Sequence, residues 1–335
     1  MYHARFYGNH YEIGFQWGSR LAKHANYILN NLPFPITEER IGFAEECLPI
    51  YQEYFPEILD EIQGIADGQS CDVKLLQGLL FSIYAMPPAC QCSCFAVSNE
   101  NSIFFGRNSD FLTAIEKNNL NVIYRFPSDS FSFTGNTTAF VQMEDGVNEK
   151  GLAVGLTSVY PPSIRPGMNA GLLLRFFLEK CRSVDEVIFY LNKFPISSAQ
   201  TFTVADASGN LAVLECYCDK VSVLRPIKEK PYVCATNRFH SDELSLVNTQ
   251  GIDDWQAETR YQTLVNFLEA HAKEMSLGES KQLLRGEHGF LCQYDRSTGK
   301  DTVWSVLYDL KEHQIYRTEK NPSRTDYKLD KRFPF

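Results

Sequence analysis

The stretch from Cys92 to Asp110 constrains this chain more than any other part of its sequence. Apolar and polar residues alternate over residues 92–97 and again over 103–110, on either side of a polar turn. This pattern predicts a β-hairpin of two short antiparallel strands. The turn would bring Arg107 and Asp110 back to the end of the hairpin at which Cys92 stands.

Cys92 therefore has the neighbours that a cysteine nucleophile needs. A guanidinium such as that of Arg107 favours the thiolate over the thiol. The carboxylate of Asp110 can orient an amine or accept a hydrogen bond. The sequence thus predicts nucleophilic chemistry about a quarter of the way along the chain.

Composition excludes several other classes of function. The chain has 335 residues, 44% hydrophobic and 22% charged, which is enough for a large core in one or two domains. Its net charge of −9 comes from dispersed acids, and no run of Lys and Arg predicts a nucleic-acid partner. No uninterrupted apolar run of about 18 residues predicts a membrane span, and the N-terminus lacks a basic region followed by an apolar stretch. We expect a cytoplasmic protein.

The ten cysteines are expected to be reduced thiols, most of them small core residues. Zinc-type spacings and glycine-rich phosphate loops are both missing, so we expect no metal and no cofactor. Cys90 and Cys94 would share a strand face with Cys92 and are interpreted as packing residues. The alternative is that these thiols capture an oxidised Cys92 and protect or inactivate it. A papain-like enzyme using His240 or His288 is a weaker alternative, because no cysteine has the local signature of that class.

Periodicity predicts an α+β protein. The first 91 residues carry helical spacing, and we interpret the glycines within 11–22 and 54–68 as helix stops. From Cys92 onward, strand patterns alternate with a pair of helices, which suggests two antiparallel sheets stacked face to face and covered by helices. The expected strands include 138–143, 151–157, a hairpin over 201–216 that 221–224 and 232–236 extend, and a terminal hairpin over 302–317.

Several motifs in this order carry a resemblance to a known family. They are the glycine motifs of the helical segment, Cys92-Ser93-x-Phe95, Gly106-Arg107-Asn108-x-Asp110, Val147-Asn148-Glu149-Lys150-Gly151-Leu152, Ala235-Thr236-Asn237 and Trp304-Ser305. The sequence resembles the acyl-coenzyme A:6-aminopenicillanic acid acyltransferase-like family. That family is related to the choloylglycine hydrolases and belongs to the N-terminal-nucleophile (Ntn) hydrolases.

The resemblance implies a four-layer αββα sandwich and a precursor that cuts itself between Gln91 and Cys92. Residues 1–91 would be a helical prosegment or small subunit, and 92–335 the catalytic region. Cys92 matches the nucleophile, Arg107 and Asp110 match a second motif, and Asn237 matches an asparagine that stabilises the oxyanion. After the cut, the new α-amine, with an ordinary pKa of about 7.7–8.0, would act as the base.

The implied activity is hydrolysis or acyl transfer on a linear amide or thioester, through an acyl-enzyme at Cys92 and without a cofactor. The partner would be a small-molecule substrate; the oligomeric state is left open. The family also places a late arginine in the pocket, and the sequence offers only Arg296 or Gln293 near that position. The alternative is a family member that is never cut and serves as an inactive precursor or binding protein.

Overall fold

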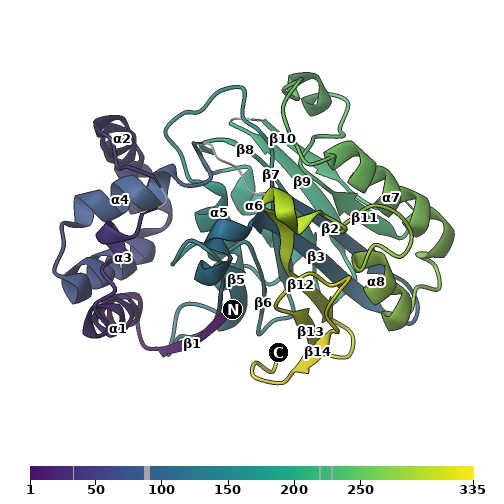
Figure 1. Ribbon diagram of the computed structural model, residues 1–335, viewed down its shortest axis with the longest axis horizontal. Coiled ribbons are helices and arrows are strands. Elements are labelled where there is room, and N and C mark those ends of the chain that lie inside the picture. Colours follow the sequence, from purple (N-terminus) through teal and green to yellow (C-terminus); the bar gives the residue numbers. More distant parts are fainter. Residues whose placement is uncertain (33, 87–90, 219, 228) are drawn as a thin grey trace.

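The computed structural model describes residues 1–32, 34–86, 91–218, 220–227 and 229–335. Two stacked β-sheets form the centre of the molecule (Figure 1). The eight-stranded sheet has the order β1 (Tyr2–Tyr7), β4 (Leu120–Arg125), β5 (Phe133–Thr137), β6 (Asp145–Asn148), β7 (Ala153–Ser158), β8 (Ala199–Ala205), β9 (Leu211–Tyr217), β10 (Lys220–Leu224). The six-stranded sheet has the order β11 (Tyr232–Ala235), β2 (Gln91–Ser98), β3 (Ile103–Leu112), β12 (Lys300–Asp309), β13 (Gln314–Thr318), β14 (Lys328–Asp330).

Helices cover the outer face of each sheet, which completes four αββα layers. The apolar faces of α5 (Ala170–Lys180) and α6 (Val184–Leu191) pack on the eight-stranded sheet. On the other side, α7 (Ala257–His271) and α8 (Leu277–Leu284) pack on the six-stranded sheet. Small, β-branched and aromatic residues pack between the sheets. The predicted fold class, a four-layer αββα sandwich, is confirmed.

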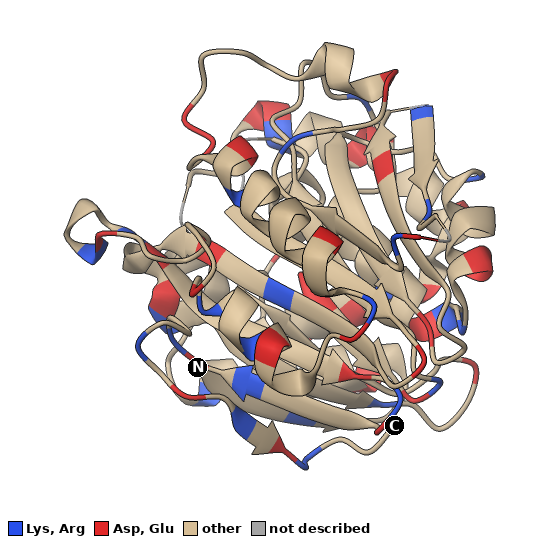
Figure 2. Ribbon diagram, turned by 90° about the vertical axis from the view of Figure 1, so that its right-hand side faces the viewer, with Lys and Arg blue, Asp and Glu red and all other residues tan. Residues whose placement is uncertain are grey.

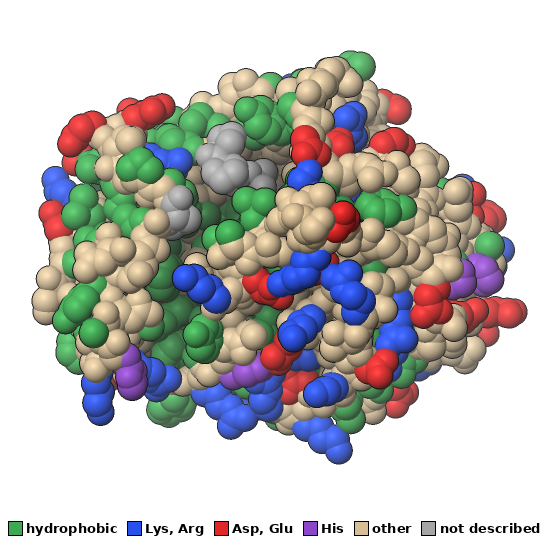
Figure 3. Space-filling model, in the orientation of Figure 1, with side chains coloured by type: hydrophobic (Ala, Val, Ile, Leu, Met, Phe, Trp, Pro, Cys, Tyr) green, Lys and Arg blue, Asp and Glu red, His purple; other side chains and the backbone are tan. Residues whose placement is uncertain are grey.

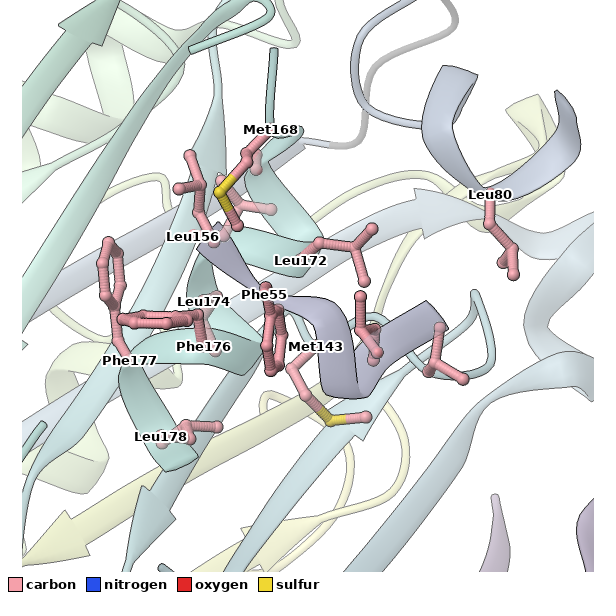
Figure 4. Packing of buried hydrophobic residues seen from close by; sticks show 14 of the residues in the cluster. Phe55, Leu80, Met143, Leu156, Met168, Leu172, Leu174, Phe176, Phe177 and Leu178 are labelled. Atoms are coloured by element: carbon pink, nitrogen blue, oxygen red, sulfur yellow. The ribbon is translucent and has the colours of Figure 1, made fainter. Parts of the chain in front are cut away.

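The first 91 residues are mostly helical, as predicted. They form α1 (His10–Lys23), α2 (Glu38–Tyr54), α3 (Pro56–Gln69) and α4 (Val73–Ser82), which stand together on one side in Figure 1. This segment also supplies β1, which pairs in parallel with β4. In Figure 4, Phe55 of this segment faces Phe176 of α5, and their ring centroids lie 5.3 Å apart. The segment is thus built into the core.

Surface character differs between the parts of the molecule. Hydrophobic side chains gather over the N-terminal helices on the face shown in Figure 3. Seen from the α7 and α8 side, acidic and basic residues are interspersed along the described chain (Figure 2). No helix in the described ranges is long and apolar enough to cross a membrane.

Two predicted strands differ from the structure. Residues 138–143 are irregular, because their polar groups bond to helical segments: the Gln142 amide donates to the Leu80 carbonyl, and the Met143 N–H donates to the Gly171 carbonyl. The strand predicted at 232–236 does not extend the 201–216 hairpin. As β11, it instead pairs with β2 in the other sheet, with Tyr232 opposite Val97. This pairing places Ala235, the last residue of β11, opposite Cys94, and so brings Asn237 to Cys92.

The interpretation of the glycines as helix stops was wrong. Gly14 and Gly18 lie inside α1, and Gly64 and Gly68 lie inside α3. These glycines let the two helices touch through their backbones. A Cβ at Gly64 would lie 2.3 Å from the Tyr11 carbonyl oxygen, and one at Gly14 would lie 2.0 Å from that of Glu61.

Gly64→Ala is therefore expected to lower the free energy of unfolding, by about 1–3 kcal/mol, because the helices must move apart to admit the methyl group. Urea unfolding measures the change. Gly42→Ala is the matched control, since Gly42 lies in α2 and a Cβ there meets nothing within 4 Å. That control should be neutral or stabilising, because alanine favours helices over glycine. Equal effects at both positions would contradict the close packing of α1 and α3.

Candidate active site

Cys92 lies near the start of β2, on the face that points between the two sheets. In the antiparallel pair of β2 and β3, Cys92 stands opposite Ser109, and Gln91 stands opposite Asp110. The hairpin predicted from the sequence is thus confirmed. The Cys92 side chain is fully buried, and its Sγ accepts a hydrogen bond of 2.8 Å from Nη2 of Arg107.

The Arg107 guanidinium is held in place by groups of the opposite sheet. Its Nη1 donates to Oδ2 of Asp145 at 2.8 Å, and its Nε donates to the Leu156 carbonyl at 3.0 Å. Asp145 also accepts hydrogen bonds from the Trp304 indole and the Tyr308 hydroxyl, each 2.9 Å long. These contacts leave Nη2 aimed at the sulfur, so a positive charge faces the position of the thiolate.

Asn237, just beyond β11, contacts the backbone of Cys92. Its Oδ1 accepts a hydrogen bond of 2.9 Å from the Cys92 N–H, and its Nδ2 donates to the Ser158 carbonyl at 2.7 Å. The structure therefore brings Asn237 to the Gln91–Cys92 peptide bond. Its role as an oxyanion donor stays a prediction.

Arg260 is a site residue that the sequence reasoning missed. It is fully buried on the first turn of α7, where its Nη1 donates to the Cys92 carbonyl at 2.6 Å and to Ser93 Oγ at 2.9 Å. Its Nη2 donates to Oδ1 of Asn237 at 2.9 Å. The Trp255 carbonyl, which precedes the helix, accepts from its Nε at 3.0 Å. Nothing in the polar sequence around Arg260 distinguishes it from a surface arginine.

The two positions that the sequence offered for a late arginine lie elsewhere. Arg296 pairs with Glu116 and Asp301. Gln293 bonds to the loop that contains Gly286 and Leu291. Arg260, also in the later part of the chain, is an arginine that contacts the Cys92 carbonyl.

Asp110 lies on the opposite face of β3 from Arg107 and reaches Cys92 through Arg260. Its carboxylate accepts hydrogen bonds from Thr302 Oγ1 at 2.5 Å and from the Tyr294 hydroxyl at 3.0 Å, and it lies 3.7 Å from Nη1 of Arg260. Burial raises the pKa of Asp110 to about 6, against the opposing effect of Arg260. Asp110 thus contacts Arg260, and Arg260 in turn donates to the Cys92 carbonyl.

The competing groups are placed less favourably than Cys92. Burial raises the pKa of the Cys94 thiol to about 12, although Arg107 opposes that rise. Cys90 lies outside the described residues. His240 bonds to Glu258, and His288 packs against Phe267, so each has a structural partner away from the hairpin.

Arg260→Ala is expected to slow any reaction of Cys92 by about 10²–10³-fold, because the Cys92 carbonyl and the Asn237 amide lose a shared charged donor. Guanidinium ions added to this variant should restore part of the rate by occupying the vacated position. Arg238→Ala is the control, because Arg238 is part-buried and bonds to Asp254. Its rate should change little and should not respond to guanidinium. Loss of rate without rescue would assign Arg260 a purely structural role.

A family model decides the relationship of this chain to known proteins. The model described as "Acyl-coenzyme A:6-aminopenicillanic acid acyl-transferase" matches residues 97–324, more than half of the chain. The chain belongs to this acyl-transferase family. Arg107, Asp110, Asn237 and Arg260 lie within the matched range, and Cys92 lies just before it. Members of this Ntn-hydrolase family are amidases and acyltransferases.

Three solved structures are similar to this chain, and the first of them supports the fold. A penicillin V acylase from Agrobacterium tumefaciens matches with a TM-score of 0.50 and 19% identity, over 71% of this chain and 84% of that one. An N-acylethanolamine-hydrolyzing acid amidase ortholog from Caenorhabditis elegans has a TM-score of 0.48 and 16% identity, over 66% and 93% of the two chains. A conjugated bile acid hydrolase from Clostridium perfringens has a TM-score of 0.49 and 16% identity, over 73% and 97%.

Proposed function

We propose that this chain is an autoprocessing cysteine Ntn enzyme, an amidohydrolase or acyltransferase that acts on linear amides or thioesters through an acyl-enzyme at Cys92. The observation that carries the proposal is the pair of contacts at Cys92. Its sulfur accepts from Arg107 at 2.8 Å, and its N–H donates to Asn237 at 2.9 Å. One residue therefore has both its nucleophilic atom and its future amine held by polar groups.

In the processing step, the Cys92 thiol attacks the Gln91 carbonyl carbon, and the bond from that carbon to the Cys92 nitrogen breaks. The nitrogen gains a proton, and residues 1–91 remain joined to Cys92 as a thioester. Water then hydrolyses the thioester, which regenerates the thiol and leaves Cys92 with a free α-amine. That amine can accept the thiol proton in later turnovers, since its ordinary pKa lies near neutrality.

In turnover, the same thiol would take the acyl group of a small-molecule amide or thioester and pass it to water or to an amine. Residues 1–91 would then be a small subunit and 92–335 the catalytic one. A cytoplasmic location is part of this proposal and is supported by free thiols at Cys92, Cys94 and Cys216. Neither a metal nor a cofactor is needed for this chemistry.

Intact-mass spectrometry of the purified protein under denaturing conditions tests the proposal. We expect two pieces that meet between Gln91 and Cys92, and an added acyl mass on the 92–335 piece after brief exposure to an acyl thioester. A single full-length chain that takes up no acyl group would instead favour the alternative, a family member that remains an inactive precursor or binding protein.

A further inference from the structure

A second carboxylate, that of Glu144, stands beside the pair formed by Cys92 and Arg107. Its Oε2 lies 3.7 Å from Nη2 of Arg107, the same nitrogen that donates to the Cys92 sulfur. Glu144 is fully buried and directly precedes Asp145, whose carboxylate contacts Nη1 of Arg107. One guanidinium therefore faces two carboxylates and a thiol.

The hydrogen bonds of Glu144 come from three segments of the chain. Oε1 accepts from the Tyr84 hydroxyl at 2.8 Å and from the N–H and hydroxyl of Thr138 at 3.1 and 2.8 Å. Oε2 accepts from Ser109 Oγ at 3.3 Å. Burial raises the pKa of Glu144, while Arg107, Thr138 and Tyr84 oppose the rise. These donors favour the ionised carboxylate over the neutral acid.

Tyr84 is the donor that comes from the segment before the Gln91–Cys92 bond. Its φ is 62°, in the left-handed region that bulky residues rarely adopt. It also packs closely on the start of α5, where a Cβ at Gly171 would lie 2.9 Å from its ring. Strained backbone of this kind persists only where the surrounding structure fixes it. The hydroxyl is therefore held against Glu144.

A negative charge near a thiol makes the thiolate harder to form, because both then compete for the same cation. We propose that Glu144 is a positioning residue that shares Arg107 with Cys92 and holds back ionisation of the thiol, and that Tyr84 of the upstream segment maintains this effect through its hydrogen bond. This inference rests on the proposed function in taking Cys92 as the nucleophile. The upstream segment then restrains the nucleophile that it precedes.

Other charged and titratable groups around this cluster are accounted for by their own partners. On the inter-sheet side they are Cys94 on β2, Asp145 on β6, Tyr308 on β12 and Arg317 on β13. On the other face of the six-stranded sheet they are Asp110 on β3 and Arg260 on α7. All of these groups are present in every variant tested, so the comparison isolates Glu144.

The test is a pH titration of the Cys92 thiolate by its ultraviolet absorbance, taken for each purified variant as the difference from the same variant carrying Cys92→Ala. In Glu144→Gln, the midpoint of thiolate formation should fall by about one pH unit, since a nearby negative charge is removed. Tyr84→Phe should produce a smaller fall. The double variant should match Glu144→Gln, because Tyr84 acts through Glu144.

Tyr124→Phe is the matched control. Tyr124 is a buried tyrosine that donates to another buried carboxylate, that of Glu61, at 3.0 Å. Its loss should leave the Cys92 midpoint unchanged. An unchanged or higher midpoint in Glu144→Gln would overturn the proposal, as would additive shifts in the double variant. The titration needs no substrate. Intact mass taken on the same samples states whether each variant is cut, and midpoints are compared only between variants in the same state.

Discussion

Replacing Cys92 with alanine is expected to leave the chain uncut and to abolish acyl transfer, with rates falling by at least about 10⁴-fold. The sulfur is the atom that Arg107 faces at 2.8 Å, and an alanine methyl group cannot attack a carbonyl. The fold should survive, because alanine fits the buried strand position. Intact mass and the uptake of an acyl group from a thioester measure the loss.

Cys71→Ala serves as the matched control for that experiment. Cys71 is a half-buried free thiol that follows α3, away from the hairpin. This variant should be cut and acylated like the wild type. If Cys92→Ala were still cut before residue 92, or if Cys71→Ala lost its activity, Cys92 would not be the nucleophile.

Replacing Arg175 with methionine is expected to lower the free energy of unfolding by about 3–5 kcal/mol. Arg175 is fully buried on α5 and pairs with two carboxylates, Glu179 of the same helix and Glu61 of α3, the latter at 2.7 Å. Its guanidinium also lies 3.9 Å from the ring centroid of Tyr124. Without Arg175, Glu61 loses its buried cationic partner, and Glu179 keeps only His10.

The acidity of Glu179 supports this expectation. Burial alone would raise the pKa of Glu179, but Arg175 and His10 lower it to about 2. A carboxyl group whose pKa is lowered by folding stabilises the protein above its unfolded pKa, and this contribution disappears as the pH falls toward 2. The loss in Arg175→Met should therefore be largest near neutral pH and smaller in acid.

Arg182→Met provides the control, because it breaks a pair with the same spacing at the surface. Arg182, just before α6, and Glu186, inside it, lie 3.1 Å apart at the surface, and such pairs contribute about 0–1 kcal/mol. Urea unfolding compares the two variants. A loss in Arg175→Met no larger than that in Arg182→Met would show that Glu61 and Glu179 are not held as ions. The triple variant Glu61→Gln, Arg175→Met, Glu179→Gln should recover much of the loss, since no charge is then buried.

The local sequence determined the hairpin and, with it, the contact between the Cys92 sulfur and the Arg107 guanidinium. Strand alternation and a tight turn act over a few residues, so the register that sets Cys92 opposite Ser109 follows from short-range geometry alone. The same holds for α5, α6 and the terminal hairpin, whose patterns match the elements found. Asn237 was predicted only through the resemblance to the family.

The tertiary structure decided the rest, because those features depend on partners far away in the chain. Arg260 lies 168 positions from the Cys92 carbonyl that it contacts, and nothing in its own helix marks it as buried. Strand β11 pairs with the edge of β2 in the six-stranded sheet and not with the predicted hairpin. This pairing brings Asn237 to Cys92. The glycines of α1 and α3 end no helix. They allow the backbones of the two helices to touch, a contact that exists only when both helices are packed together. Periodicity reports which face of an element is apolar, whereas the neighbour of that face is fixed by the packing of the whole chain.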